Sequence, residues 1–381
     1  MRHRSLWVAT LLSLALHAYV GSRLLPAIAP GPLALALALA YLFLSAVLMP
    51  APLMVRLASL PERAADVLAW TGYLAMGVFS SLFVLTVLRD LALALAAVVA
   101  LAVPVPLEAL SRLSAPGVLL LTALISGVGV FNARRTASVV NVELPIAGLP
   151  PALAGFCIVQ ISDLHVGPTI KRGYVAAIVE RVNGLAPDVV AITGDLIDGA
   201  VHRVRGHVEP LRELRSTHGT YCVTGNHEYY HGIGPWLEEW RRLGLRVLLN
   251  EGRTLEHRGE RVLLGGVTDY GAHRFDATHR SDPAAAVRAG ADVAVKVLLA
   301  HQPRSAPAAA EAGFDVQLSG HTHGGQFWPW PFLVPMQQPF VSGLKRLGTL
   351  QVYTSRGTGY WGPPIRFGAP SEITRLTLVP G

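Results

Sequence analysis

The stretch Phe156–His165, FCIVQISDLH, sets the pattern for the C-terminal two-thirds of this chain. An apolar run rich in β-branched residues ends abruptly in an aspartate and a histidine. The same design returns downstream in VVAITGDLID (189–198), TYCVTGNHE (220–228), VKVLLAHQP (295–303) and VQLSGHTHGG (316–325). Amphipathic segments such as Arg172–Leu185 separate these apolar runs. Strands that alternate with helices are typical of a layered α/β domain.

Polar side chains follow each of the five predicted strands directly. Ligands of open α/β sheets collect at the carboxyl ends of the strands, so we expect the five motifs to meet at one edge. Residues i and i+2 of a strand point to the same face. Asp163 with His165, and His321 with His323, are therefore each expected to send two side chains in one direction.

The residue types of these motifs predict a metal centre. Aspartate, histidine and asparagine without cysteine suit borderline-hard divalent ions such as Mn²⁺, Fe²⁺ or Zn²⁺. The candidate ligands are more numerous than one ion with a bound water needs: Asp163, His165, Asp195, Asn226, His301, His321 and His323. We therefore expect two divalent ions that share a carboxylate, with Mn²⁺ favoured.

The order D-x-H, G-D-x-x-D, G-N-H-E, H and G-H-x-H resembles that of the calcineurin-like metallophosphoesterases, and it is complete between Asp163 and His323. The runs GHTHGGQ (320–326) and RGTGYWGPPIRFGAPSEIT (356–374) resemble the bacterial membrane- or wall-associated branch of that superfamily. The resemblance extends over about residues 150–381. It implies a four-layer α/β/β/α sandwich that hydrolyses phosphoric esters.

The resemblance also implies a role for each motif residue. The first ion would be held by Asp163, His165 and His323, and the second by Asn226, His301 and His321. Asp195 would bridge the two ions. His227 would contact the phosphate and protonate the leaving group, and Asp198 would orient His227. Two ions about 4 Å apart lower the pKa of a bridging water, which would supply hydroxide for in-line attack.

One position departs from the pattern of the protein Ser/Thr phosphatase branch. That branch has an arginine directly after the second aspartate, where this chain has Gly199. A phosphoprotein phosphatase is therefore disfavoured, and another residue must hold the substrate. Arg356 is the candidate, with a surface ion pair as the equal alternative. His231 and Asp269 are further residues for which a place at the site and a structural role both stay open.

The N-terminal third has a different composition. The chain is 51% hydrophobic and 15% charged, but only 11 of its 57 Asp, Glu, Lys and Arg residues lie in residues 1–132. A membrane-spanning helix needs about 20 mostly apolar residues. Five segments come close: Ser5–Leu25, Pro32–Val55, Val67–Leu88, Leu91–Leu107 and Ser114–Asn132. We predict a membrane region of about five helices over 1–135, a linker with an edge strand over 136–154, and the phosphoesterase domain over 155–381.

The distribution of charged and polar residues in the sequence limits which binding partners are expected. His17 is the only ionisable residue inside a predicted span, which favours an anchor over a transporter. The basic residues behind the net charge of +7 are scattered, so no nucleic acid is expected. The bilayer and a phosphorylated small-molecule or lipid substrate fit better. We expect a multi-pass protein of the cell membrane. An odd number of spans, together with the exported relatives, places the catalytic domain outside the cytoplasm.

The sequence thus predicts a membrane-anchored hydrolase of a phosphodiester or pyrophosphate bond, in a lipid- or nucleotide-linked substrate. A phosphomonoesterase is the alternative enzyme, and a non-catalytic membrane metal sensor or scaffold is the alternative from another class. The apolar segment Phe327–Phe340, FWPWPFLVPMQQPF, follows the last motif. It is either a lid that packs on its own domain or a surface that faces the bilayer or an acyl chain.

Overall fold

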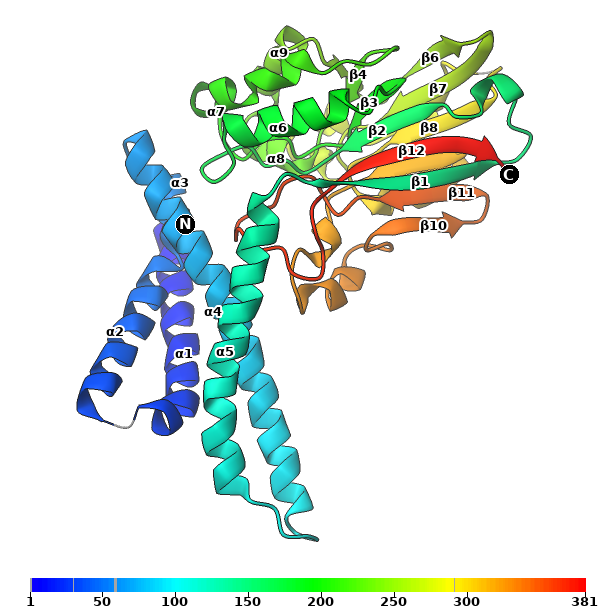
Figure 1. Cartoon of the computed structure of the whole chain (residues 1–381). Coiled ribbons are helices and arrows are strands. Elements are labelled where there is room, and N and C mark those ends of the chain that lie inside the picture. Colours follow the sequence, from blue (N-terminus) through cyan, green and yellow to red (C-terminus); the bar gives the residue numbers. More distant parts are fainter. Residues whose placement is uncertain (1, 30, 58–59, 291) are drawn as a thin grey trace. The chain divides into compact units, whose positions relative to one another are not determined.

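The computed structural model describes residues 2–29, 31–57, 60–290 and 292–381 (Figure 1). The chain divides into two compact units. The first is Met1–Asn132 with Gly362–Phe367, and the second is Ala133–Trp361 with Gly368–Gly381. The boundary near residue 132 lies close to the predicted one. The sequence did not indicate that the short segment Gly362–Phe367 belongs to the helical unit.

The first unit is helical. Its elements are α1 (Arg2–Ile28), α2 (Pro32–Leu48), α3 (Ala51–Leu57), α4 (Glu62–Val99) and α5 (Leu107–Arg134), the last of which leads into the second unit. Within the described residues, four stretches are long and apolar enough to cross a membrane: Leu6–Ile28, Pro32–Val55, Glu62–Val99 and Leu107–Arg134. The described part of the chain thus contains four apolar helices of this kind, where the sequence predicts about five.

The difference arises at Arg89 and Asp90, which were expected in a linker but lie inside α4. Arg89 Nε donates to Ser114 Oγ at 2.9 Å, and Arg89 also donates to the backbone oxygen of Ser111 at 2.8 Å. Asp90 accepts from Arg23 Nε at 2.7 Å. Because these charges are paired within the helical unit, the helix continues through them. The expectation that His17 is the only ionisable residue within a span was wrong for the same reason.

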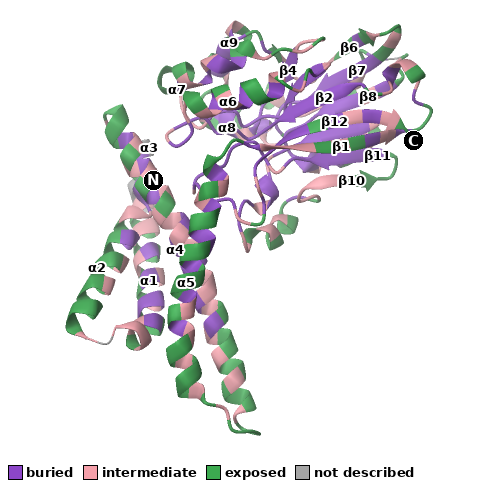
Figure 2. Cartoon of the chain, in the orientation of Figure 1, coloured by how far each residue is buried: buried purple, intermediate pink, exposed green. Residues whose placement is uncertain are grey.

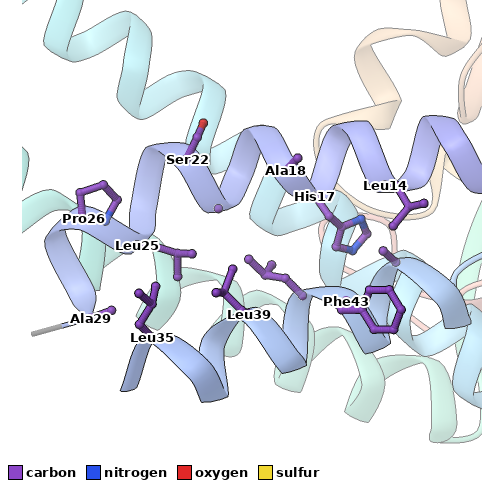
Figure 3. A pocket seen from close by; sticks show the side chains of 13 residues that line it. Leu14, His17, Ala18, Ser22, Leu25, Pro26, Ala29, Leu35, Leu39 and Phe43 are labelled. Carbon is purple, nitrogen blue, oxygen red and sulfur yellow. The ribbon is translucent and has the colours of Figure 1, made fainter. Parts of the chain in front are cut away.

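His17 joins three helices of this unit. One ring nitrogen lies 2.8 Å from the backbone oxygen of Ser13 and the other 3.0 Å from Ser45 Oγ, while the ring stacks on Phe79. Beside it, α1 and α2 line an apolar hollow of about 610 Å³ that includes Leu39 and Phe43 (Figure 3). One polar contact within α1, one to α2 and the ring stacked on α4 account for this buried histidine by packing within the helical unit.

The second unit contains two six-stranded sheets. The first sheet has the order β1-β12-β2-β3-β4-β5, and β2 to β5 run parallel. Its strands are β1 (Ser138–Ile146), β2 (Cys157–Ile161), β3 (Val189–Ile192), β4 (Thr220–Cys222), β5 (Arg246–Val247) and β12 (Glu372–Pro380). The central strands β2 and β3 are apolar except for Gln160, because both faces of a parallel sheet are covered.

The second sheet has the order β10-β11-β9-β8-β7-β6, with parallel pairs from β11 to β7 and an antiparallel strand at each edge. Its strands are β6 (Glu251–His257), β7 (Glu260–Gly266), β8 (Val295–Leu299), β9 (Val316–Ser319), β10 (Gly343–Leu347) and β11 (Leu350–Thr354). Strands β8 and β9 lie where the apolar runs at 295–303 and 316–325 predict them.

The central strands of both sheets are largely buried (Figure 2), and side chains on their two faces belong to different layers of the core. Val159 and Ile161 of β2 pack toward the helices, while Ile158 packs between the sheets with Val297 of β8. Leu298 faces the helices of the second sheet. The helices of the second unit are α6 (Arg172–Asn183), α7 (Val201–Val208), α8 (Asn226–Tyr230), α9 (Ile233–Arg242), α10 (Pro283–Val287) and α11 (Ala306–Glu311). The predicted four-layer α/β/β/α sandwich is confirmed, and both cysteines are free and buried in it.

Candidate metal centre

The five strand-end motifs converge as expected. Potential ligand atoms of Asp163, His165 and His323 all lie within 4.8 Å of one another, and so do those of Asp195, His301 and His321. Asn226 Oδ1 lies 3.2 Å from His301 Nε2 and so belongs to the second group. The structure therefore brings together all seven residues that the sequence marks as candidate ligands.

The backbone brings them together by a different route from the one expected. β2 ends at Ile161 and β9 at Ser319, so neither Asp-x-His nor His-x-His lies within a strand. Five of the seven residues instead adopt left-handed backbone conformations, with φ between 49° and 70°: Asp163, His165, Asp195, His321 and His323. Such strained conformations in non-glycine residues concentrate at functional sites. Sharp turns, not strand alternation, aim the paired side chains.

Glycines beside the ligands allow the motifs to approach one another. A Cβ added to Gly225 would lie 2.1 Å from Asp195 Oδ1, and one added to Gly320 would lie 2.1 Å from Asp163 Oδ2. No side chain fits at either distance. The glycines of these two motifs are therefore each required by a carboxylate of another motif.

The first donor group has the chemistry of a metal site. His165 Nε2 faces His323 Nε2 at 3.0 Å, and His323 Nε2 lies 3.5 Å from Asp163 Oδ1. Burial lowers the pKa of His165 to about 3, so the ring is neutral, which is the form that binds metals. Its Nδ1 is buried without a hydrogen-bond partner within the described structure. The neutral imidazole of His165, the imidazole of His323 and the buried carboxylate of Asp163 form a donor set that fits a divalent ion.

The second donor group shares Asp195 with the first. Asp195 Oδ2 lies 3.2 Å from His301 Nε2 and 3.8 Å from His165 Nε2. His301 Nδ1 lies 2.8 Å from the backbone oxygen of Thr193, a contact that turns Nε2 toward the centre. His321 Nδ1 lies 3.2 Å from His301 Nε2, and burial lowers the pKa of His321 to about 3. A single carboxylate therefore faces both donor groups.

His227 lies beside this carboxylate. Its backbone N–H donates to Asp195 Oδ1 at 2.9 Å, and its Nε2 is 4.0 Å from Asp195 Oδ2. Its Nδ1 lies 3.2 Å from Asp198 Oδ1, as the orienting role requires. Burial alone would lower the pKa of His227, but Asp195 and Asp198 outweigh burial and raise it to about 9. His231 Nε2 also contacts Asp198, at 3.0 Å, and so lies at the site.

Two supporting residues were missed by the sequence reasoning. The Glu228 carboxylate accepts backbone N–H groups from Gly225 at 2.7 Å, Leu196 at 2.8 Å and Asp195 at 3.1 Å. It thereby fixes the turn that carries the shared aspartate. Ser162 Oγ donates to Asp163 Oδ2 at 2.5 Å. The last letter of G-N-H-E was the available signal for Glu228, but a sequence does not show which backbone it supports.

Arg356 and Asp269 each have a defined partner. Arg356 Nε donates to Glu372 Oε2 at 2.6 Å, so the ion pair exists, and the role of Arg356 in substrate binding stays a prediction. Asp269 is buried and accepts from Gln302 Nε2 at 2.8 Å. Gln302 directly follows His301, so Asp269 supports the segment of a candidate ligand.

Three aromatic side chains lie beside His227. The sequence did not indicate this cluster. Tyr230 and Trp361 have ring centroids 5.2 and 5.8 Å from that of His227, and Phe275 is 5.6 Å from Tyr230. About half of each of these aromatic residues is exposed. These residues come from three distant parts of the sequence, so no local sequence motif indicates that they lie together.

A two-sheet sandwich with aspartates, histidines and an asparagine gathered at its strand ends places this chain in the metallophosphoesterase class. Residues 157–325 match the family of calcineurin-like phosphoesterases. An uncharacterized metallophosphoesterase of Aquifex aeolicus is 30% identical over 223 residues, which cover 58% of this chain and 84% of that protein. The chain belongs to the calcineurin-like metallophosphoesterase family.

Two relatives are more similar in sequence. An uncharacterized metallophosphoesterase of Helicobacter pylori strain J99 is 42% identical over 233 residues, which cover 58% of this chain and 60% of the relative. The transmembrane protein with metallophosphoesterase domain of Danio rerio is 38% identical over 269 residues, or 68% of this chain and 61% of the relative. The matched part of the chain thus spans about 60% of the length of these two relatives.

Proposed function

We propose that this chain is a membrane-anchored phosphoester hydrolase with a two-metal centre, and that it cleaves a phosphodiester or pyrophosphate bond. The observation that carries the proposal is the position of Asp195, whose Oδ2 faces His301 in one donor group and His165 in the other. A carboxylate placed in this way is the bridge that a two-ion site needs.

The donor sets divide as the family pattern implies. One ion would be held by Asp163, His165 and His323, the other by Asn226, His301 and His321, with Asp195 shared. When bound, the two ions supply positive charge that orients a phosphoryl group and lowers the pKa of water. The donor atoms suit Mn²⁺, Fe²⁺ or Zn²⁺, and the preference for Mn²⁺ is part of the proposal.

The residues of the chain supply the proton transfer. The two neighbouring carboxylates favour the protonated form of His227 at neutral pH. Asp198 holds Nδ1, which leaves Nε2 facing the centre to donate a proton to the departing oxygen. Such a general acid contributes about 10²–10⁴-fold to the rate.

The exposed aromatic residues beside His227 favour a substrate with an apolar or flat group next to the phosphate. Tyr230, Phe275 and Trp361 offer ring faces and edges where a leaving group would lie. A lipid- or nucleotide-linked diester or pyrophosphate has such a group on the leaving side. A phosphomonoester can carry such a group as well, so the substrate panel decides between the proposed diesterase or pyrophosphatase and the alternative phosphomonoesterase.

The test is hydrolysis of a substrate panel by the full chain in detergent, with added Mn²⁺, Fe²⁺ or Zn²⁺. The panel contains a soluble diester, a soluble monoester, a lipid diester and a nucleotide-linked lipid. Metal-dependent cleavage of the diesters supports the proposal, and faster cleavage of the monoester favours the phosphomonoesterase. Metal binding without turnover on any substrate favours the sensor or scaffold.

The four-helix count also affects the proposed side of the membrane. An even number of crossings returns the chain to the side on which it began, so the odd-span argument for an extracytoplasmic domain no longer applies. Three arginines then lie toward the opposite side: Arg23, Arg89 and Arg112. Six lie on the N-terminal side: Arg2, Arg4, Arg56, Arg63, Arg134 and Arg135. By the positive-inside rule, this distribution favours a cytoplasmic domain, and we propose that side.

A further inference from the structure

The segment that follows the last metal motif has a buried base and an exposed apolar tip. Phe327 is buried, and Phe340 packs against the core of the second sheet. Between them, Phe332 is 72% exposed, Leu333 49% and Met336 81%. Of the two interpretations left open by the sequence, a lid packed wholly on its own domain therefore does not describe these three side chains.

Hydrogen bonds fix the base of this segment to neighbours of the candidate ligands. Gln338 Nε2 donates to Gln302 Oε1 at 3.1 Å, and Gln302 directly follows His301. Thr322, which lies between His321 and His323, donates through Oγ1 to the backbone oxygen of Val341 at 2.6 Å. The apolar tip is thus held on a base that is part of the metal-centre framework.

The sequence that flanks the tip carries basic residues and no acidic ones. The sequence from Val316 to Ser371 contains no aspartate or glutamate, but it contains Lys345 and Arg346, which are exposed on β10. Arg304 donates to the backbone oxygen of Gln337 at the base of the segment, and its guanidinium lies 5.2 Å from the ring centroid of Tyr270. Exposed apolar side chains with basic neighbours are the composition that binds an anionic lipid surface.

We propose that the tip 332–336 inserts into the interfacial region of the bilayer that holds the chain's own apolar helices. The occupant is a lipid surface, because the described part of the same chain carries four helices long and apolar enough to cross a bilayer, and because the basic residues that flank the tip in sequence complement anionic head groups. This inference deepens the proposed function, on which its consequence rests: the metal centre would receive a substrate that resides in the bilayer.

Depth measurement by a nitroxide label tests the insertion without reference to hydrolysis. Full-length Phe332→Cys and Met336→Cys variants are labelled and reconstituted in vesicles of phosphatidylethanolamine and phosphatidylglycerol. The native cysteines Cys157 and Cys222 are buried and should take no label. Treatment of the unsubstituted protein with the same reagent is the control for this. Glu256→Cys, exposed on the opposite edge strand β6, is the matched control.

The labels at 332 and 336 are expected to collide more with oxygen than with a water-soluble nickel chelate, and the label at 256 should show the reverse. Equal access of the chelate to positions 332 and 256 would overturn the proposal. So would protection of position 332 from both reagents, which indicates packing against protein or a second copy. An enzyme that is active in detergent but has a water-exposed tip would overturn the insertion alone and leave the proposed function intact.

A paired activity measurement tests the consequence. The Phe332→Ser/Met336→Ser variant changes two exposed side chains, so its melting temperature should match that of the unsubstituted protein. Cleavage of a diester embedded in vesicles should fall about tenfold or more, because two large apolar side chains no longer leave water. Cleavage of a soluble diester in detergent should be unchanged. An equal loss on both substrates would contradict a role at the lipid surface.

Discussion

Asp198 Oδ1 lies 3.2 Å from Nδ1 of His227 and 3.0 Å from Nε2 of His231, so one buried carboxylate orients two histidines at the edge of the metal centre. Only His227 also contacts the shared Asp195. This asymmetry separates the residue proposed to transfer a proton from the one that supports its orientation.

Replacement of His227 by Gln should lower kcat by about 10²–10⁴-fold on diesters with alkyl leaving groups, because these need a proton on the departing oxygen. The loss should be much smaller with p-nitrophenolate, which leaves without protonation. Metal content, measured by elemental analysis, should stay unchanged. His231→Gln is the matched control and should cost less, and equal losses for both leaving groups would rule out the acid role.

Removing the orienting carboxylate should have an intermediate effect. Asp198→Asn is expected to cost about 10–100-fold in kcat, the usual range for a residue that orients a functional group. The ions should remain bound, because Asp198 belongs to neither ligand set. A variant that loses metal together with activity would show that Asp198 supports the centre itself.

Replacement of Asp195, the carboxylate shared by both donor groups, should remove metal as well as activity, unlike replacement of Asp198. Asp195→Asn is expected to lose both activity and metal, with the bound metal falling from two ions per chain to one or none, since both ions would lose a charged ligand. Metal content and turnover measured on the same preparation check this. Retention of two ions in this variant would contradict the bridging assignment.

Metal ions should also stabilise the fold. A ligand that binds only the native state stabilises it by RT ln(1 + [L]/Kd), about 2.7 kcal/mol at a hundredfold excess over Kd. Chelation should therefore lower the melting temperature of the detergent-solubilised chain, and Mn²⁺ should restore it. In the Asp195→Asn variant the same additions should have little effect, and an undiminished response there would place the stabilising ion elsewhere.

The glycine of the third motif should not accept a side chain. Gly225→Ala is expected to displace Asp195, whose Oδ1 would lie 2.1 Å from the new Cβ, and to abolish metal binding. Gly173→Ala is the control, because a Cβ at this position in α6 meets nothing within 4 Å. Calorimetry measures the melting temperature of both variants, and elemental analysis measures their metal content. Normal metal content in Gly225→Ala would contradict the prediction and show that the backbone at Gly225 can shift away from Asp195.

Reporter fusions after Arg135 test the side of the membrane. With four crossings and the arginine distribution described above, a fused fluorescent protein should fold in the cytoplasm and a fused alkaline phosphatase should be inactive. The opposite pattern would restore the extracytoplasmic placement and require either an odd number of crossings or a reversed orientation.

Much of this fold was predictable because its signals are local. Apolar runs each followed directly by Asp, His or Asn predicted the strands, their alternation with helices, and the seven candidate ligands. Those signals suffice because parallel strands are buried on both faces, so their sequences are predominantly apolar. The N-terminal third likewise indicated membrane helices through its long apolar runs alone, because the length of such a run is itself a local property.

Tertiary structure decided what depends on partners distant in the sequence. Arg89 and Asp90 looked like a linker, but partners on α1 and α5 allow α4 to continue through them. Glu228 supports backbone N–H groups about thirty residues away, and the aromatic group around His227 is assembled from three separate segments. The sequence determined which residues could bind metal. Only the folded backbone, with its left-handed turns at the strand ends, determined that one aspartate faces both donor groups.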